Sequence, residues 1–412
     1  MELLLDRERF VATMQAQAEI GATENGGLHR LALSDADKRV RDWFAAQLDA
    51  AGLSTRVDAF GNMFGRREGT RDVAPVLVGS HLDSQPYGGI YDGALGVVAA
   101  LELVRELDAR GIGTERPIEI VNWTNEEGSR FQPTLQGSGV WAGVHDIDAE
   151  YARTDDDGTT VEDELERIGY KGSTPAEPGE AYDSYLELHV EQGPSLEATG
   201  ADVGVVTGIV GLRWGAITFR GEANHSGATP MHHRKDALVA AADVITQVRR
   251  LPSTLGERTV ATVGALDVSP NSINVVPGTA TFTYGVRDPS GDVLDDAVDR
   301  IHAATEAAAT QEGVDWEIDE RATATPVSFP DRCVDSVERA AADLGYDAVR
   351  LPSGGVHDAT NVHRVCDAGM VFAVSEGGKS HSEAEYTSWD DCHRAANTLA
   401  TAALDLAGVA SD

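Results

Sequence analysis

The amino-acid sequence predicts an α/β protein with a mixed sheet flanked by helices and an inserted α+β domain. In the first half of the chain, short apolar runs such as 76–78 and 117–123 alternate with segments of helical periodicity. Between residues 208 and 326 the order changes to β-α-β-β-α-β, which is the split βαβ arrangement. We therefore expect one domain at 1–207 and 327–412, and an inserted domain at 208–326.

The elements of the first part follow from periodicity and from turn chemistry. Residues 1–52 predict two helices, of which the second begins with acidic residues and ends at Gly52. A hairpin is expected over 55–67 around Gly61-Asn62. A strand at 76–78, a helix at 94–107 and a strand at 117–123 follow. The acidic, turn-rich residues 151–183 predict a surface excursion with one short helix, and 185–191 alternates strictly as a strand.

The rest of the chain predicts the inserted domain and then a return to the first. Strands are expected at 216–220, 260–268, 280–287 and 314–318, and helices at 234–251 and 294–311. Beyond them we expect a helix at 334–344, a strand at 370–374 and a last helix at 389–406, with loops at 353–358 and 375–385 between them.

The charge of the chain limits its partners. The formal net charge is −35, from 68 acidic and 33 basic residues, so nucleic acid and anionic membranes would be repelled. A hydrophobic content of 42% argues against disorder. Only four of the basic residues are lysines (Lys38, Lys171, Lys235 and Lys379), and this scarcity beside abundant acids predicts a halophilic-type surface, adapted to very high salt.

Compartment and redox chemistry are limited in a similar way. No apolar run approaches the ~20 residues that a membrane helix needs. The first residues carry acids and no signal architecture, so we expect a cytoplasmic protein. Cys333, Cys366 and Cys392 lie far apart without a C-x-x-C pair, which disfavours both a disulfide framework and a thiolate metal site.

The stretch 79–96 brings possible metal ligands to one edge of the predicted sheet. His81 ends the strand and Asp92 precedes the helix, and open α/β sheets bind ligands at that edge. Imidazole and carboxylate are ligands for Zn²⁺ or Mn²⁺, and Asp83 is placed to hold the second ring nitrogen of His81. A hydrogen-bonded core histidine beside helix-capping acids explains the same residues, so the stretch alone leaves both interpretations open.

Further residues at similar positions favour the metal site. Glu126 and Glu127 follow the strand 117–123, His189 lies on the polar face of 185–191, and His381 lies in a late loop. Each alone has an ordinary explanation, as a solvated loop, an exposed strand residue or a turn. Together they would make two metal positions bridged by Asp92, where a water becomes a hydroxide near neutral pH and attacks a polarised carbonyl carbon. One of two adjacent carboxylates can bind metal while the other accepts the proton.

Seven ordered motifs resemble one enzyme family across essentially the whole chain. They are GSHLDS, YDGALGV, NEEGSRF, ELHVEQGP, HSGATPM, NVVPG and SHSEAEYT. The set resembles the amidase/hydantoinase/carbamoylase branch of the M20 metallopeptidase clan, which contains N-carbamoyl-L-amino acid hydrolases, allantoate amidohydrolases and β-ureidopropionases. EQGP and HSGATPM separate this branch from the exopeptidases of the clan.

The resemblance implies a role for each matching residue. Two divalent ions per subunit, such as Mn, Zn, Co or Ni, would bind to five residues, with Asp92 shared: His81, Asp92 and His189 for one, and Asp92, Glu127 and His381 for the other. Glu126 would be the general base, Asp83 the orienting residue behind His81, and Gln192 would face the substrate.

The same resemblance makes the inserted domain a lid whose sheet edges form a homodimer. His225 would reach into the partner's site and stabilise the oxyanion. Asn274 and Arg287 would bind the carboxylate of a small ureido substrate, since a guanidinium suits a planar anion. Without the resemblance, Arg287 reads as an ordinary surface arginine.

One loop departs from the pattern of the family. Where the family commonly has Ser-Gly-Ala-Gly-His-Asp-Ala, residues 353–359 read SGGVHDA, so Val356 replaces a glycine. The change removes freedom for positive φ and adds bulk near the expected substrate, which bears on the substrate-binding roles of Gly355 and His357.

Three functional hypotheses follow. The first is a metal-dependent amidohydrolase that cleaves the carbamoyl or ureido C–N bond of an N-carbamoyl-L-amino acid or allantoate-like substrate. The second is an M20-type dipeptidase or aminoacylase, which EQGP and Arg287 disfavour. The third is a catalytically dead scaffold on the same fold, which would have lost a ligand or the base, whereas all six such residues stand here: His81, Asp92, Glu126, Glu127, His189 and His381.

Overall fold

The computed structural model describes residues 1–410, which divide into two compact units. The first unit comprises Met1–Thr207 and the chain from Phe329 onward, and the second comprises Gly208–Ser328.

The first unit is built on a mixed sheet with strand order β1-β2-β4-β3-β5-β16-β6, in which β15 also pairs with β6. Strands β3, β4, β5 and β16 run parallel to their neighbours within that group, whereas β2 and β6 pair antiparallel at its two sides. The strands are β1 (Ser54–Val57), β2 (Met63–Arg67), β3 (Val76–His81), β4 (Ile118–Trp123), β5 (Ser184–Val190), β6 (Val203–Ile209), β15 (Ala348–Ser353) and β16 (Asp367–Ala373). Every residue of β3, β4 and β5 is buried, as in a sheet covered on both faces. The expected mixed sheet flanked by helices is confirmed.

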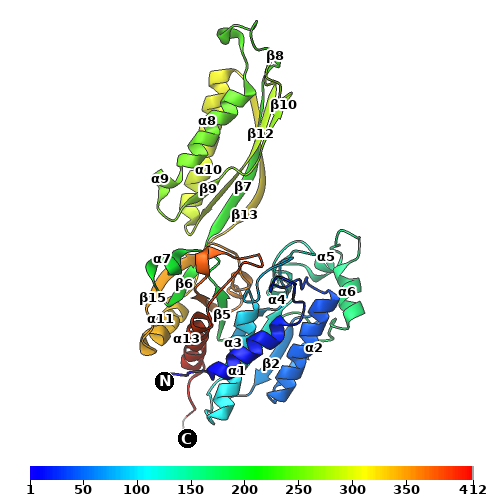
Figure 1. The fold of residues 1–412 in the computed structure, drawn as a ribbon, viewed down its shortest axis with the longest axis vertical. Coiled ribbons are helices and arrows are strands. Elements are labelled where there is room, and N and C mark those ends of the chain that lie inside the picture. Colours follow the sequence, from blue (N-terminus) through cyan, green and yellow to red (C-terminus); the bar gives the residue numbers. More distant parts are fainter. Residues whose placement is uncertain (411–412) are drawn as a thin grey trace. The chain divides into compact units, whose positions relative to one another are not determined.

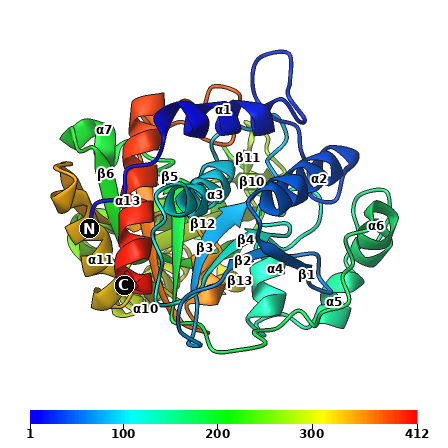
Figure 2. The ribbon, with the colours of Figure 1, turned by 90° about the horizontal axis from the view of Figure 1, so that it is seen from below.

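Helices cover this sheet. The long ones are α1 (Arg7–Ala18), α2 (Asp35–Ala50), α3 (Ala94–Ala109), α11 (Asp331–Asp343) and α13 (Trp389–Ala407). Helix α3 packs on β3 and β5, α13 packs on β16 and β5, and α1 lies beside α3 and α13 (Figures 1 and 2). Short helices fill the connections: α4 (Gln136–Trp141), α5 (Ile147–Tyr151), α6 (Val161–Ile168), α7 (Ser195–Thr199), α12 (Ala359–Val362) and the 3₁₀ turn Glu376–Gly378.

Two local expectations for the first unit were wrong in detail. The hairpin β1–β2 exists, but it closes with Val57 opposite Met63 over the five-residue loop 58–62, because the buried carboxylate of Asp58 accepts the N–H groups of Phe60 and Asn62. The segment 151–183 does not lie entirely on the surface, because part of it is buried. Its helix α6 contributes Val161, Leu165 and Ile168 to a separate apolar cluster. Leu33, Phe60 and Phe131 belong to the same cluster.

The second unit is an antiparallel sheet with two helices on one face, as the split βαβ pattern predicts (Figure 1). The strand order is β10-β12-β7-β13, with β9 also on β12. The elements are β7 (Gly211–Arg220), β8 (Asn224–His225), the 3₁₀ turn Met231–His233, α8 (Ala237–Arg250), α9 (Pro252–Leu255), β9 (Val260–Thr262), β10 (Leu266–Ser269), β11 (Val275–Val276), β12 (Thr279–Asp288), α10 (Gly291–Glu312), β13 (Asp315–Ala324) and β14 (Val327–Ser328). The expected single strand 260–268 is two strands, β9 and β10.

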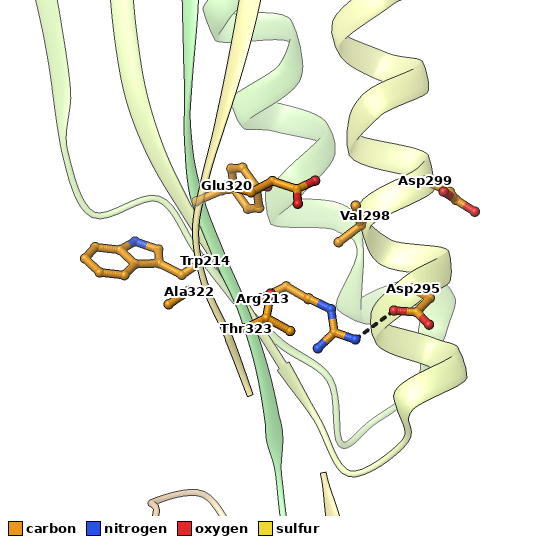
Figure 3. A pocket seen from close by; sticks show the side chains of 9 residues that line it. Arg213, Trp214, Asp295, Val298, Asp299, Glu320, Ala322 and Thr323 are labelled. Carbon is orange, nitrogen blue, oxygen red and sulfur yellow. Dashed lines mark hydrogen bonds and ion pairs between the residues drawn. The ribbon is translucent and has the colours of Figure 1, made fainter. Parts of the chain in front are cut away.

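A hollow of about 250 Å³ lies between this sheet and α10 (Figure 3). Tyr284, Gly215 and Glu320 occupy one row across β12, β7 and β13, so the middle position of the row has no side chain. The register of β13 also shifts between Glu320 and Ala322. The side chain of Tyr284 lies over Gly215, where a Cβ atom would be 2.8 Å from the tyrosine hydroxyl oxygen. Arg213, which lines the hollow, forms an ion pair of 2.8 Å with Asp295 on α10.

Helix lengths and hydropathy settle one further point. Among residues 1–410, no helix is both long enough and apolar enough to cross a membrane.

Candidate metal centre

The parallel strands of the first unit deliver the candidate ligands to one edge of the sheet. His81 is the last residue of β3, Glu127 lies in the loop after β4, His189 is the sixth of the seven residues of β5, and His381 follows β16. Because β4, β3, β5 and β16 are neighbours and run parallel, their carboxyl ends meet at this edge. Asp92 completes the group from the loop before α3.

The ligand atoms form two groups that share Asp92. One is His81, Asp92 and His189, and the other is Asp92, Glu127 and His381, with the ligand atoms of each group within 4.8 Å of one another. Oδ1 of Asp92 lies 2.8 Å from Nε2 of His189 and 3.7 Å from Nε2 of His81. Oδ2 of Asp92 lies 3.4 Å from Nε2 of His381, which is 3.6 Å from Oε2 of Glu127. The geometry therefore offers two three-ligand positions bridged by one carboxylate.

Backbone carbonyls fix how the two buried histidines face the site. Nδ1 of His81 lies 3.0 Å from the carbonyl oxygen of Asp83, and Nδ1 of His189 lies 3.0 Å from that of Val190. An Nδ1–H that donates to a carbonyl leaves the lone pair of Nε2 pointing into the site. Nε2 of His81 is buried, and no group among residues 1–410 hydrogen-bonds to it. An orphaned buried imidazole nitrogen that faces carboxylates fits a metal cation.

Asp83 contacts His81 differently from what the sequence predicts. Its carboxylate lies 3.7 Å from Nδ1 of His81, whereas its own carbonyl oxygen lies at 3.0 Å. The carboxylate instead accepts the backbone N–H of Glu126 at 3.3 Å and that of Glu127 at 3.2 Å. The side chain of Asp83 therefore positions the loop of the two glutamates, and only its backbone orients the imidazole.

A glycine beside the site is required by close packing. Gly93 has φ +63°, and a Cβ atom there would lie 2.3 Å from Nε2 of His81. Any side chain at residue 93 would displace Nε2 of His81. Asp92 therefore supplies ligand atoms, and Gly93 leaves the space that the imidazole needs.

The electrostatics of the site also fit a divalent cation. Burial lowers the pKa of His81 to about 4, although Asp92 opposes this effect. Burial would also lower the pKa of His189, but Asp92 and Glu187 outweigh it and raise that pKa to about 9. Burial and neighbouring carboxylates raise the pKa values of Glu126 and Glu127 well above the ordinary value. A cation among them would offset this mutual repulsion.

Glu126 lies where a proton acceptor is expected. It is buried, and its Oε2 is 3.5 Å from Nε2 of His81. It belongs to neither of the two ligand groups. The two adjacent glutamates thus occupy different places, one beside the first group and one inside the second.

Of the substrate residues in the first unit, Gln192 lies at the second ligand group. Its Nε2 donates to Oδ2 of Asp92 at 2.9 Å and is 3.2 Å from Nε2 of His381. A Cβ on Gly355 would be 3.2 Å from Oε1 of Gln192, so this glycine lies close to it.

His357 and Val356 lie in the loop after β15 and differ in exposure. His357 is 1% exposed, its Nε2 lies 2.8 Å from Oγ of Ser353, and its ring centroid is 4.4 Å from that of His189, so the imidazole lies buried against the ligand. Val356 is 40% exposed and is absent from the residues of 1–410 with positive φ, so its backbone does not use the freedom that a glycine would give.

The remaining candidates belong to the second unit. His225 on β8 pairs with Val275 on β11, and the N–H of Ser226 donates to the carbonyl oxygen of Asn274, so their segments lie together. The exposed imidazole of His225 accepts at Nδ1 the N–H groups of Gly227 and Ala228. Arg287 is exposed on β12, opposite Leu212 of β7.

Two residues that hydrogen-bond to the ligands or their loops were missed by sequence reasoning. Glu385 is buried, and its Oε1 accepts the N–H groups of Tyr91 and Asp92 while Ser380 donates to its Oε2 at 2.7 Å. It therefore ties the loop of Asp92 to that of His381. Gln85 contacts both carboxylate oxygens of Glu127. Glu385 lies in SHSEAEYT and Gln85 follows GSHLDS, which was the available signal.

Comparison with known proteins decides the family. Residues 77–405 match peptidase family M20/M25/M40. The chain belongs to this family. It is 40% identical over 406 residues to an N-carbamoyl-L-amino-acid amidohydrolase of Rhizobium meliloti, covering 98% of this chain and 97% of that protein. It is 36% identical over 380 residues to an allantoate amidohydrolase of Bacillus subtilis, covering 90% of each. A crystal structure of an amidase of the hydantoinase/carbamoylase family from Burkholderia multivorans is 42% identical, with a TM-score of 0.94 over 98% of both chains.

These likenesses confirm the resemblance seen in the motifs. Within the M20 family, the chain is a member of the amidase/hydantoinase/carbamoylase branch, and it is a hydrolase of non-peptide C–N bonds. The family and the two ligand groups indicate dependence on divalent metal. The relatives do not favour the dipeptidase or aminoacylase alternative.

Proposed function

We propose that this M20 hydrolase cleaves the carbamoyl or ureido C–N bond of an N-carbamoyl-L-amino acid or allantoate-like substrate, with two divalent ions held by five residues. The observation that carries the proposal is the pair of ligand groups bridged by Asp92, with Glu126 3.5 Å from His81 and outside both groups. When bound, divalent ions such as Mn²⁺, Zn²⁺, Co²⁺ or Ni²⁺ polarise a carbonyl oxygen and acidify water.

Glu126 would act as the general base. It would accept a proton from the attacking water and return it to the leaving nitrogen, so that neither charge builds up in the transition state. Burial and the neighbouring carboxylates raise the pKa of Glu126, and bound cations would offset the part that the carboxylates contribute. Asp83 would hold its backbone in place through the N–H bond at 3.3 Å.

The remaining candidate residues are proposed to act on the substrate. We propose Gln192, Gly355 and His357 near the metal positions, with His357 acting through the packing of its ring on His189. From the second unit we propose that Arg287 and Asn274 bind the substrate carboxylate. His225 would stabilise the oxyanion in the site of the partner subunit of a homodimer.

Metal removal and a substrate panel test the proposal together. Chelation should abolish ammonia release from N-carbamoyl-L-amino acids, β-ureidopropionate or allantoate, and added Mn²⁺, Co²⁺, Ni²⁺ or Zn²⁺ should restore it. Dipeptides and N-acyl amino acids assayed for amine release serve as the comparison. Faster turnover of the dipeptides, or full turnover of a ureido substrate by metal-free protein, would contradict the proposal.

A further inference from the structure

Gln85 holds Glu127 by three hydrogen bonds. Its backbone N–H donates to Oε1 at 3.0 Å, and its side-chain Nε2 donates to Oε2 at 2.8 Å. The same Nε2 lies 3.2 Å from the carbonyl oxygen of Glu127, to which it also donates. One residue therefore occupies both carboxylate oxygens and the backbone of Glu127, and this fixes the glutamate's side-chain conformation.

Gln85 is itself held by its surroundings. The N–H of Ser84 donates to the carbonyl oxygen of Arg30 at 2.9 Å, and the N–H of Arg30 donates to Oγ of Ser84 at 3.0 Å. The carbonyl oxygen of Gln85 accepts the N–H of Gly88 at 3.2 Å. The side chain is half-buried. The backbone of Gln85 is thus fixed by the fold, and its side chain extends from this fixed position to Glu127.

We propose that Gln85 is a positioning residue that presents Glu127 to the position formed by Asp92, Glu127 and His381, and that it sets the cation affinity there. The assignment rests on the proposed function of these three residues as metal ligands. A carboxylate oxygen has two lone pairs, so one hydrogen bond on each oxygen of Glu127 leaves acceptor capacity for a cation. Because the conformation is already ordered, less entropy is lost when the cation binds.

The proposal predicts an effect on one metal position only. Hydrogen-bond partners of metal ligands typically change affinity 10–100-fold. Gln85 has no hydrogen bond to His81, Asp92 or His189 within residues 1–410. The position formed by these three residues should therefore keep its affinity when the amide is removed.

Titration of metal-free protein with Mn²⁺ against a chelating indicator tests this effect. Gln85→Met keeps the length of the side chain and removes its amide donors. It should weaken one binding step by about 10–100-fold and leave the other step and the melting temperature of the metal-free protein unchanged. Gln85→Asn, one methylene short, should show the same selective loss. Gln247→Met, at an exposed glutamine of α8, is the matched control and should change neither step.

A second substitution assigns the affected step. Glu127→Ala removes the second position, and the step that it abolishes should be the one that Gln85→Met weakens. In the double variant, the remaining step should equal that of Glu127→Ala alone, because Gln85 acts only through Glu127.

The proposal is overturned by an unchanged titration, by equal weakening of both steps, or by a further loss when Gln85→Met is added to Glu127→Ala. The titration needs no substrate, so the two proposals can fail separately. If the protein hydrolyses no ureido compound but Gln85→Met weakens the step that Glu127→Ala abolishes, the role of Gln85 stands and the proposed function fails. If the protein is active on a ureido compound but Gln85→Met leaves that binding step unchanged, the proposed function stands and the role of Gln85 fails.

Discussion

Glu126 and Glu127 are neighbours in sequence, yet their surroundings assign them different work. Both backbones are tied to the carboxylate of Asp83. The side chain of Glu126 turns toward His81, with Oε2 3.5 Å from Nε2, and the side chain of Glu127 turns toward His381 and is held by Gln85. A left-handed backbone at Asn125, with φ +52°, precedes the pair. Its side chain donates to the carbonyl oxygen of Phe131, so this conformation is held by a buried hydrogen bond.

Isosteric substitutions should separate these two roles. Glu127→Gln should lower metal content, because a neutral amide is a poorer ligand than a carboxylate. Glu126→Gln should retain metal and lose about 10²–10⁴-fold in turnover, the usual cost of removing a general acid–base group. Metal content and the rate of ammonia release, measured on the same preparations, check both. Metal lost from Glu126→Gln and kept by Glu127→Gln would exchange the two assignments.

The candidate metal ligands and Glu126 could be predicted from the sequence, whereas the residues that hydrogen-bond to them, Gln85 and Glu385, could not. His81, His189 and the two glutamates lie at or just after the ends of strands that a short apolar run or strict alternation reveals, and Asp92 precedes a helix of clear periodicity. Gln85 reaches Glu127 across 42 positions and Glu385 reaches Asp92 across 293, so neither contact leaves a local pattern. The spacing of Asp83 from His81 does not distinguish its carboxylate from its carbonyl oxygen, which lie 3.7 and 3.0 Å from Nδ1 of His81.

At the scale of elements, burial overrides the polarity that a sequence pattern suggests. Strand β5 alternates apolar and polar residues, yet all seven of its residues are buried, because helices and neighbouring segments cover both faces. Glu187 on its polar face accepts hydrogen bonds from Ser80 at 2.9 Å and from the backbone of Ala359 at 3.0 Å. The strands β6 and β15 and the short helices α4, α5 and α7 were not predicted, because they are too short or too weakly patterned to stand out from loops.

Helix α8 of the second unit begins at a cap that can be tested. The carboxylate of Asp236 accepts the N–H groups of Leu238 and Val239 at 3.0 and 3.2 Å. Asp236→Ala should therefore lower the free energy of unfolding by about 0.5–2 kcal/mol. Urea denaturation, together with hydrogen exchange of the first-turn amides of α8, measures the loss.

Asp243→Ala is the matched control for this cap. Asp243 is exposed on the same helix, so the change gives a similar gain in helix propensity without removing a cap. Equal stability of the two variants would show that the cap contributes nothing measurable.

At the scale of the whole molecule, charge is the dominant feature. Acidic residues outnumber basic ones 68 to 33, so pairing every base still leaves a net charge of −35. Arginines carry most of the ion pairs, and several hold two carboxylates at once, as Arg350 does with Asp335 and Glu338. Exposed pairs of this kind contribute only about 0–1 kcal/mol each. The unpaired excess of acids, which repel one another over the whole surface, should outweigh them.

Stability should therefore rise with salt. Screening weakens both the exposed ion pairs and the general repulsion, and the repulsion is the larger effect for a chain of this charge. The melting temperature should climb steeply as KCl increases from millimolar concentrations, and level off toward about 1 M, where the Debye length is about 3 Å. The slope should shrink at a pH low enough to protonate part of the carboxylates, because fewer like charges then remain to be screened. A melting temperature that is flat or falls with KCl at neutral pH would show that the paired charges govern stability. A slope independent of pH would show that the salt acts on the hydrophobic core and not on the surface acids.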